Sequence, residues 1–293
     1  MVTIRRYIAI ILAFASTLSY GQGGSIGIIS SSMQTAGFTG VLDDYTGATH
    51  AYSLRLTNSS YTGDAISISR ASDSATTGIG FDGEDLDVAS INTFCSGTTC
   101  YVDTIYDQVG STDIHAYLGS TAVIYESGAV TTQNGKSAIK TYGDYFSTNS
   151  MEYSDFVTSS HCYNITVSNF DGSTDCSPIQ IGTGGVNSSF VGFGSSAAFS
   201  LNETNIFTFD FAYGASAGTY IAEGVYASSS SISMYMNGTA ITPTLLQNGS
   251  FSPSGSTLFI LAQTCDYFQE TLIWNTDQSS NRSGIYTNVS TYW

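Results

Sequence analysis

An acidic loop, Asp82-Gly-Glu-Asp-Leu-Asp87, contains side chains that could do chemistry. Carboxylates are the hard oxygen ligands of Ca²⁺, which takes about six to eight of them. The spacing matches no known calcium loop, and negative charge is also favourable at the start of a helix. The loop is therefore interpreted as a helix start, with Ca²⁺ binding as the alternative.

Histidine and nucleophile patterns are sparse. His50, His115 and His161 are scattered, with no paired spacing of the kind that holds a transition metal. The chain has no phosphate loop, and its Gly-x-Ser-x-Gly run at residues 23–27 and Gly-x-Gly-x-x-Gly run at residues 78–83 lie outside the strand–helix–strand pattern that a nucleophile elbow or a dinucleotide fingerprint requires. The sequence therefore predicts no metal site of this kind, no cofactor and no nucleophilic Ser or Cys.

Tyrosine is abundant, with 20 Tyr beside 2 Trp. An aromatic ring can cover the apolar face of a sugar while its hydroxyl bonds the rim, so this composition fits glycan recognition. Tyrosine is also a good strand residue, and we expect about three quarters of these rings to fill sheet faces.

Short alternating segments bounded by turn residues dominate the chain and predict antiparallel strands with one buried face. The Asn237-Gly238 pair suits a type I′ hairpin turn. The predicted fold is an all-β sandwich or jelly roll. The clearest strand segments are residues 65–69, 100–106, 138–142, 231–236 and 257–262.

Two stretches carry apolar residues at helical spacing instead, residues 86–94 and 277–292. The second follows an Asp/Ser start that could cap a helix. We expect Ile285 and Val289 to pack against the sandwich and close the chain.

The beginning of the chain predicts export. Arg5 and Arg6 precede an apolar run from Ile8 to Leu18, and small residues follow at positions that a signal peptidase inspects. Residues 1–21 are predicted to be a signal peptide and residues 22–293 a single domain, secreted or on the cell surface. No later segment is apolar for the length of a membrane span.

Charge excludes some partners. After removal of Arg5 and Arg6, 5 of the 7 basic residues remain against 23 acidic ones, a net charge near −18. Nucleic acids and anionic membranes need clustered Lys and Arg, so neither is expected as a partner. A neutral glycan remains compatible with this charge.

Five cysteines in an exported chain predict disulfides with one thiol left over. Cys95 and Cys100 are close enough to close a short loop. Cys162 with Cys176 is the second predicted pair, which leaves Cys265 free. The two other pairings among these three cysteines stay open.

Residues 48–117 resemble the front of the arabinofuranosidase B catalytic domain, a secreted glycosidase family with a concanavalin A-like sandwich. The resemblance rests on Phe94-Cys-Ser-Gly-Thr-Thr-Cys100 and on Thr104-Ile-Tyr-Asp-Gln108. It implies a Cys95–Cys100 disulfide and a structural role for Asp107 and Gln108. The run from Gln269 to Ile285 is similar to the closing strand and helix of lectin-like (LamG-like) modules.

The resemblance also implies a catalytic pair. A retaining arabinofuranosidase uses two carboxyl groups about 5 Å apart, one as nucleophile and one as general acid/base. The residues that match these roles are Glu203 and Asp266. The match at Glu203 needs a gap, the glycine-rich surroundings of the acid/base are absent, and the family's adjacent cysteines and trefoil domain are missing.

Five aromatic residues lie in or near the segments that shape the family's cleft and are predicted sugar contacts: Tyr163, Phe193, Tyr213, Tyr267 and Trp274. Because scaffold motifs match better than catalytic ones, the leading hypothesis is a glycan-binding module. The alternatives are a working α-L-arabinofuranosidase and a structural surface or virion-associated domain.

Overall fold

The computed structural model describes residues 37–117, 121–156, 162–170, 176–183, 186–193, 197–201, 207–211, 217–228, 231–241, 243–247, 256–263 and 265–293. The predicted signal peptide lies outside these ranges. The helices found within them are α1 (Val41–Asp44), α2 (Val88–Phe94), α3 (Tyr153–Phe156) and α4 (Arg282–Tyr292). None of these helices has the length and apolar content of a membrane span.

One antiparallel ladder is built around the strand β24, which pairs with β14 on one side and with β1 and β12 on the other. β14 pairs in turn with β19, β19 pairs with β20, and β20 pairs with β21. Asn237 and Gly238 connect the last two strands with φ of 49° and 75°, as a type I′ turn requires. The bounds are β1 (His50–Ser53), β12 (Ile139–Lys140), β14 (Cys162–Phe170), β19 (Gly218–Ser228), β20 (Ser231–Met236), β21 (Thr239–Ile241) and β24 (Tyr267–Trp274).

A second ladder runs in the order β3, β2, β6, β7, β13, β23, β15, β16, β17, β18 and β22. Its bounds are β2 (Ile66–Arg70), β3 (Thr76–Ile79), β6 (Cys100–Ile105), β7 (Ile114–Ala116), β13 (Phe146–Glu152), β15 (Cys176–Thr183), β16 (Val186–Phe193), β17 (Ala197–Leu201), β18 (Phe207–Phe211), β22 (Pro243–Gln247) and β23 (Ser256–Gln263).

The remaining strands are short, and four of them form two separate two-stranded sheets. β8 (Val123–Glu126) pairs with both β6 and β12 and so links the two ladders. β9 (Ala129–Val130) follows β8, and two small hairpins join β4 (Phe81–Asp82) to β5 (Asp85–Leu86) and β10 (Thr132–Gln133) to β11 (Lys136–Ser137).

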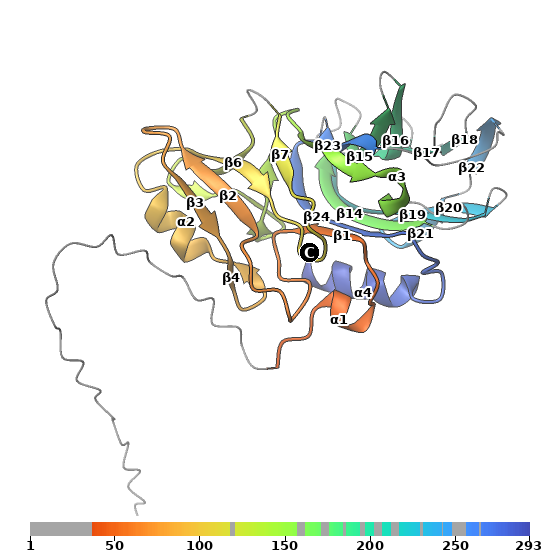
Figure 1. The fold of residues 1–293 in the computed structure, drawn as a ribbon, viewed down its shortest axis with the longest axis horizontal. Coiled ribbons are helices and arrows are strands. Elements are labelled where there is room, and N and C mark those ends of the chain that lie inside the picture. Colours follow the sequence, from red (N-terminus) through yellow and green to blue (C-terminus); the bar gives the residue numbers. More distant parts are fainter. Residues whose placement is uncertain are drawn as a thin grey trace, which may run out of the picture. The chain divides into compact units, whose positions relative to one another are not determined.

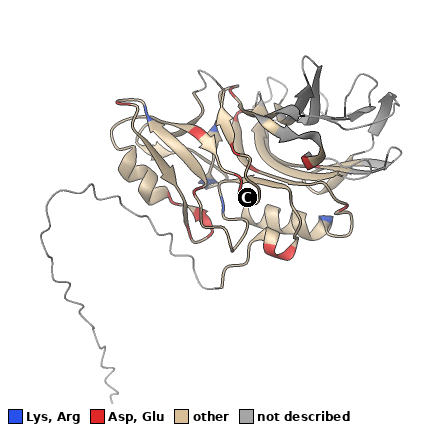
Figure 2. Ribbon diagram, in the orientation of Figure 1, with Lys and Arg blue, Asp and Glu red and all other residues tan. Residues whose placement is uncertain are grey.

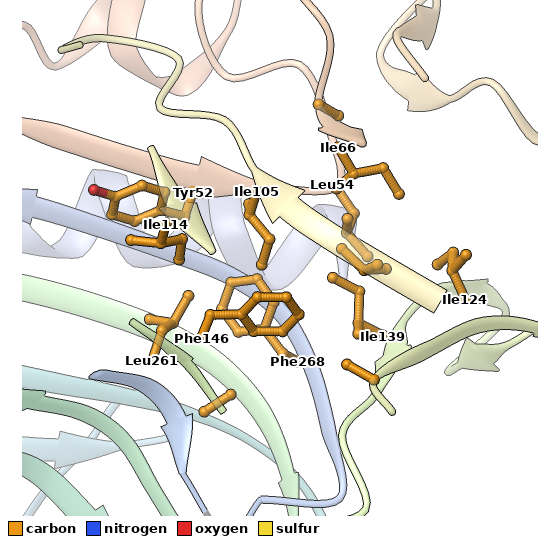
Figure 3. Packing of buried hydrophobic residues seen from close by; sticks show 14 of the residues in the cluster. Tyr52, Leu54, Ile66, Ile105, Ile114, Ile124, Ile139, Phe146, Leu261 and Phe268 are labelled. Carbon is orange, nitrogen blue, oxygen red and sulfur yellow. The ribbon is translucent and has the colours of Figure 1, made fainter. Parts of the chain in front are cut away.

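The main core fills the space between the ladders. Tyr52, Phe146, Leu261 and Phe268 come from both of them and are buried together (Figure 3). The rings of Tyr52 and Phe259 lie 5.9 Å apart, which ties β1 to β23. This packing confirms the predicted antiparallel β-sandwich.

Helices α1 and α4 lie beside the first ladder (Figure 1), and a second apolar cluster joins residues from these helices and the ladder. Ile285 and Val289 of α4 are fully buried there, against Leu272 and Trp274 of β24. The predicted closing helix and its two anchors are therefore confirmed. The earlier predicted helix is α2, whose first turn is capped by Asp87 accepting from the Ser90 amide at 2.9 Å.

Candidate functional site

Asp266 lies in the turn between β23 and β24 and is half-buried. Its amide donates to the carbonyl of Asn169 at 3.0 Å, and its own carbonyl accepts from the Thr141 amide at 2.8 Å. The turn is thus fastened to β14 on one side and to the residue after β12 on the other. An acidic residue on so fixed a backbone is suited to positioned proton transfer.

A disulfide adjoins this turn and corrects one prediction. Cys176 bonds to Cys265, so the predicted pair of Cys162 with Cys176 is wrong. The reason is strand pairing: β15 runs beside β23 with Ser177 opposite Gln263, which brings Cys176 next to Cys265. The predicted Cys95–Cys100 disulfide is confirmed.

Cys162 is the free thiol among the described residues, and it is buried at the start of β14. Burial raises the pKa of this thiol well above its usual value. The side chain therefore acts as a small apolar core residue, because only the thiolate is strongly nucleophilic.

Tyr267 follows Asp266 and is half-buried opposite Lys140 and Asn169. The Lys140 ammonium binds Glu126 at 2.9 Å and lies 4.2 Å from the ring centre of Tyr142. The hydrogen bonds to Tyr142 and Glu126 raise the pKa of Lys140. The hydrogen bond from Lys140 is also the main cause that lowers the pKa of Glu126.

Two exposed tyrosines are absent from the predicted sugar contacts, and one of them lies near the turn. Tyr142 is 55% exposed and directly follows Thr141, which bonds Asp266. Tyr117, 52% exposed, stacks on Tyr145 with ring centres 4.6 Å apart. The sequence feature that could have predicted an exposed ring at Tyr142 is the following Gly143, since a Tyr-Gly pair at the end of a strand indicates an aromatic residue in a turn.

Two of the predicted sugar contacts are core residues. Tyr163 and Trp274 have no exposed surface, and their ring centres lie 5.5 Å apart beneath α4. The Trp274 indole donates to the Tyr45 carbonyl at 3.2 Å, while the Tyr163 hydroxyl donates to Glu223 at 3.0 Å. Rings enclosed in this way have no face to offer a sugar, so these two predictions are corrected.

The other predicted site residues are placed only in part. Glu203 and Tyr213 lie outside the described residues. Phe193 ends β16 opposite Cys176, and only its backbone is described. Asp266 and Tyr267 adjoin one another in the described turn. The roles of Glu203, Asp266, Phe193, Tyr213 and Tyr267 stay predictions.

Three buried carboxylates are bound by arginine side chains, by backbone amides or by a histidine. Glu270 accepts from Arg55 Nε at 2.7 Å, and Glu223 accepts from Arg282 Nη1 at 3.0 Å. Asp107 accepts from the amides of Ala51 and Val109 and lies 2.7 Å from a ring nitrogen of His50. These carboxylates hold strands and α4 together, and the structural role implied for Asp107 is consistent with its contacts.

The acidic loop is used for protein contacts. Asp87 caps α2, Glu84 binds Arg55 at 3.1 Å, and Asp85 binds Lys136 at 2.8 Å. Within the described ranges, no three His, Cys, Asp or Glu side chains converge as a metal site. Calcium binding at this loop stays a prediction.

Residues 44–178 match the model of the catalytic family of α-L-arabinofuranosidase B. The match ends just beyond Cys176, so the Cys95–Cys100 disulfide, Asp107 and Gln108 lie within it while Glu203 and Asp266 follow it. No curated protein matches the sequence.

Solved structures of arabinofuranosidases are similar in fold. One is an arabinofuranosidase complexed with arabinofuranosyl-α-1,2-xylobiose, with a TM-score of 0.54 and 17% identity. Another is a variant GH54 α-L-arabinofuranosidase soaked with 4-nitrophenyl α-L-arabinofuranoside, with a TM-score of 0.53 and 16% identity. In each case the alignment covers 83% of this chain but only 62% of the other chain.

At such identity these structures support the fold alone. The family model and the fold agree on the scaffold, with the Cys95–Cys100 disulfide and the Asp107 and Gln108 contacts inside the matched range. The chain therefore carries a β-sandwich domain like the arabinofuranosidase B catalytic domain, as its motifs predicted.

Proposed function

We propose that this protein is an exported glycoside hydrolase of the α-L-arabinofuranosidase type, acting on arabinose-containing polysaccharide. The observation that carries the proposal is the turn at Asp266. This residue follows a disulfide-bonded cysteine, both of its backbone groups are hydrogen-bonded, and it is half-buried. The two disulfides fit an oxidising compartment outside the cytosol.

The proposed chemistry uses two carboxyl groups in two steps. Glu203 attacks the anomeric carbon while Asp266 gives its proton to the departing oxygen, and the bond from sugar to leaving group breaks. Asp266 then takes a proton from water as that water displaces Glu203. The sugar leaves with its anomeric configuration retained.

A second candidate is glycan binding without cleavage. It is favoured by the family-model match, which ends at residue 178, before both proposed catalytic residues. It is also favoured by the exposed rings of Tyr117 and Tyr142, since aromatic faces can cover the apolar face of a sugar.

Hydrolysis of 4-nitrophenyl α-L-arabinofuranoside and of an arabinosyl-xylobiose separates these candidates. We expect the wild type to cleave both and Glu203→Gln to lose at least about 100-fold on both. Asp266→Asn should lose far more on the oligosaccharide, because nitrophenolate departs without being protonated.

Asp73→Asn is the matched control, because Asp73 is an exposed turn residue paired with Arg70. It should cleave both substrates as the wild type does. A wild type that binds the oligosaccharide but cleaves neither substrate would establish the second candidate. Equal losses on both substrates for Asp266→Asn would remove that residue from the acid/base role.

A further inference from the structure

A cavity of about 660 Å³ lies alongside α4, and none of its lining residues belongs to the Asp266 turn. Gly284 and Tyr292 of α4 both line it. Tyr292 lies eight helical steps after Gly284, about 12 Å along the axis. The cavity is therefore an elongated groove of the size that small ligands occupy in proteins.

The floor of the groove is an ordered polar network. Arg55 is only 1% exposed, yet it lines the cavity. Its Nη1 donates to Glu84 at 3.1 Å and to Asn288 at 2.9 Å, while Nε and Nη2 donate to Glu270. The carboxylate of Glu84 and the amide of Asn288 are thus fixed before any ligand arrives, which favours specific binding.

The charges favour an uncharged ligand. The guanidinium of Arg55 is neutralised by Glu270, and Lys136 is paired with Asp85 at 2.8 Å. Asp44 and Glu84 add negative charge to the lining, and acidic residues mark α1 and the β4–β5 hairpin in Figure 2. A phosphate or carboxylate would meet these acids without a free cation to bind.

The walls supply hydroxyl groups and a ring. Ser283, Thr287 and Thr291 are exposed at four-residue intervals along one face of α4, and all three line the groove. The hydroxyl of Tyr45 lies so close to Gly284 that a Cβ there would displace it. The absence of a side chain at Gly284 thus lets the Tyr45 ring lie against the helix at this end.

We infer that this groove binds a neutral, hydroxyl-rich ligand, namely a short uncharged oligosaccharide. Fixed amide and carboxylate groups would bond its hydroxyls, and the small side chains of α4 leave room for sugar rings. The site is separate from the proposed hydrolytic turn, so binding here does not depend on catalysis.

Titration of uncharged xylotriose and α-1,5-arabinotriose, followed by ligand-observed NMR, tests the inference. Thr287→Trp should fill the groove from an exposed position and weaken binding of at least one trisaccharide by about tenfold or more. Thr291→Trp is a second filling variant. Thr93→Trp is the control, because Thr93 is also an exposed helical threonine whose hydroxyl bonds the carbonyl four residues earlier.

The inference holds if both filling variants weaken binding, Thr93→Trp does not, and hydrolysis by the filled variants stays at the wild-type rate. It is overturned if neither trisaccharide binds, if binding survives both filling variants, or if inorganic phosphate competes for the groove. Loss of hydrolysis in Glu203→Gln with groove binding intact would separate the two sites.

Discussion

The carboxylates beneath α4 and the aspartate at the β23–β24 turn are held in opposite ways. Glu223 and Glu270 are fully buried, and each is bound by an arginine. Asp266 is half-buried, its backbone amide and carbonyl are both hydrogen-bonded, and the preceding residue, Cys265, forms a disulfide. The two glutamates form buried ion pairs that hold the fold together, whereas the catalytic role proposed for Asp266 places it at a half-buried turn.

This difference in burial and pairing lets the proposed catalytic role of Asp266 be tested against the structural role of the buried pairs. Removing a partner from a buried ion pair leaves a charge without compensation, so changes beneath α4 should act on stability first. Changes at the turn should act on hydrolysis first.

The largest effect is expected from the Cys176–Cys265 disulfide, which spans 89 residues. In the chain-entropy model, replacing both cysteines with alanine costs about 4–5 kcal/mol of unfolding free energy, against about 2 kcal/mol for Cys95 and Cys100. Urea unfolding measures both losses. Hydrolysis by the folded fraction should also fall only in the first variant, and equal effects of the two variants on hydrolysis would contradict the role given to the turn.

Arg55→Ala should cost roughly 3–5 kcal/mol of unfolding free energy, because it leaves Glu270 buried and unpaired. Arg70→Ala, which breaks the exposed pair with Asp73, is the control and should change stability little. A loss in Arg55→Ala no larger than in the control would show that the buried network is not structural.

The buried carboxylate of Glu223 beneath α4 can be tested through the pH dependence of stability. Burial is the main cause that raises the pKa of its carboxyl group in the folded protein. The stability it contributes is therefore complete below its unfolded pKa, near 4.3, and is lost as the pH rises through the higher folded value, about 1.4 kcal/mol per pKa unit.

Glu223→Gln should remove this part of the decline, so the stability of the variant relative to the wild type, measured by urea midpoints, should rise between pH 4 and pH 7. A constant difference between the two proteins over that range would contradict the raised pKa.

The smallest effect concerns Tyr142, which has a left-handed φ of 51° despite its side chain. Tyr142→Gly relieves this conformation and should raise stability by up to about 1 kcal/mol. It should also weaken binding of an arabinosyl-oligosaccharide, because the exposed ring is gone. Asn134→Gly is the control at a similar φ of 50°, and an equal loss of binding there would remove Tyr142 from the site.

The parts of the fold that depend on local sequence could be predicted. The alternation of apolar and polar residues predicted the strands, and the Asn237-Gly238 pair predicted the hairpin turn. The helical spacing of apolar residues predicted that Ile285 and Val289 are buried in the core. All of these follow from residues close together in the chain, since period and turn chemistry are local properties.

What depends on strand pairing could not be predicted. The partner of Cys176 follows from the pairing of β15 with β23, about 80 residues apart in sequence. The burial of Tyr163 and Trp274 follows from α4 covering that face of the first ladder. Alternation shows that a strand has two faces without showing which one a distant helix will cover.

The most direct test compares Asp266→Asn with Glu270→Gln, using hydrolysis of an arabinosyl-xylobiose and urea unfolding on the same samples. We expect Asp266→Asn to lose at least about 100-fold in kcat/KM with its unfolding midpoint nearly unchanged. Glu270→Gln should lose stability while its folded fraction keeps hydrolysing. Hydrolysis that survives Asp266→Asn, or that is abolished by Glu270→Gln without loss of stability, would contradict the assignment of chemistry to the turn.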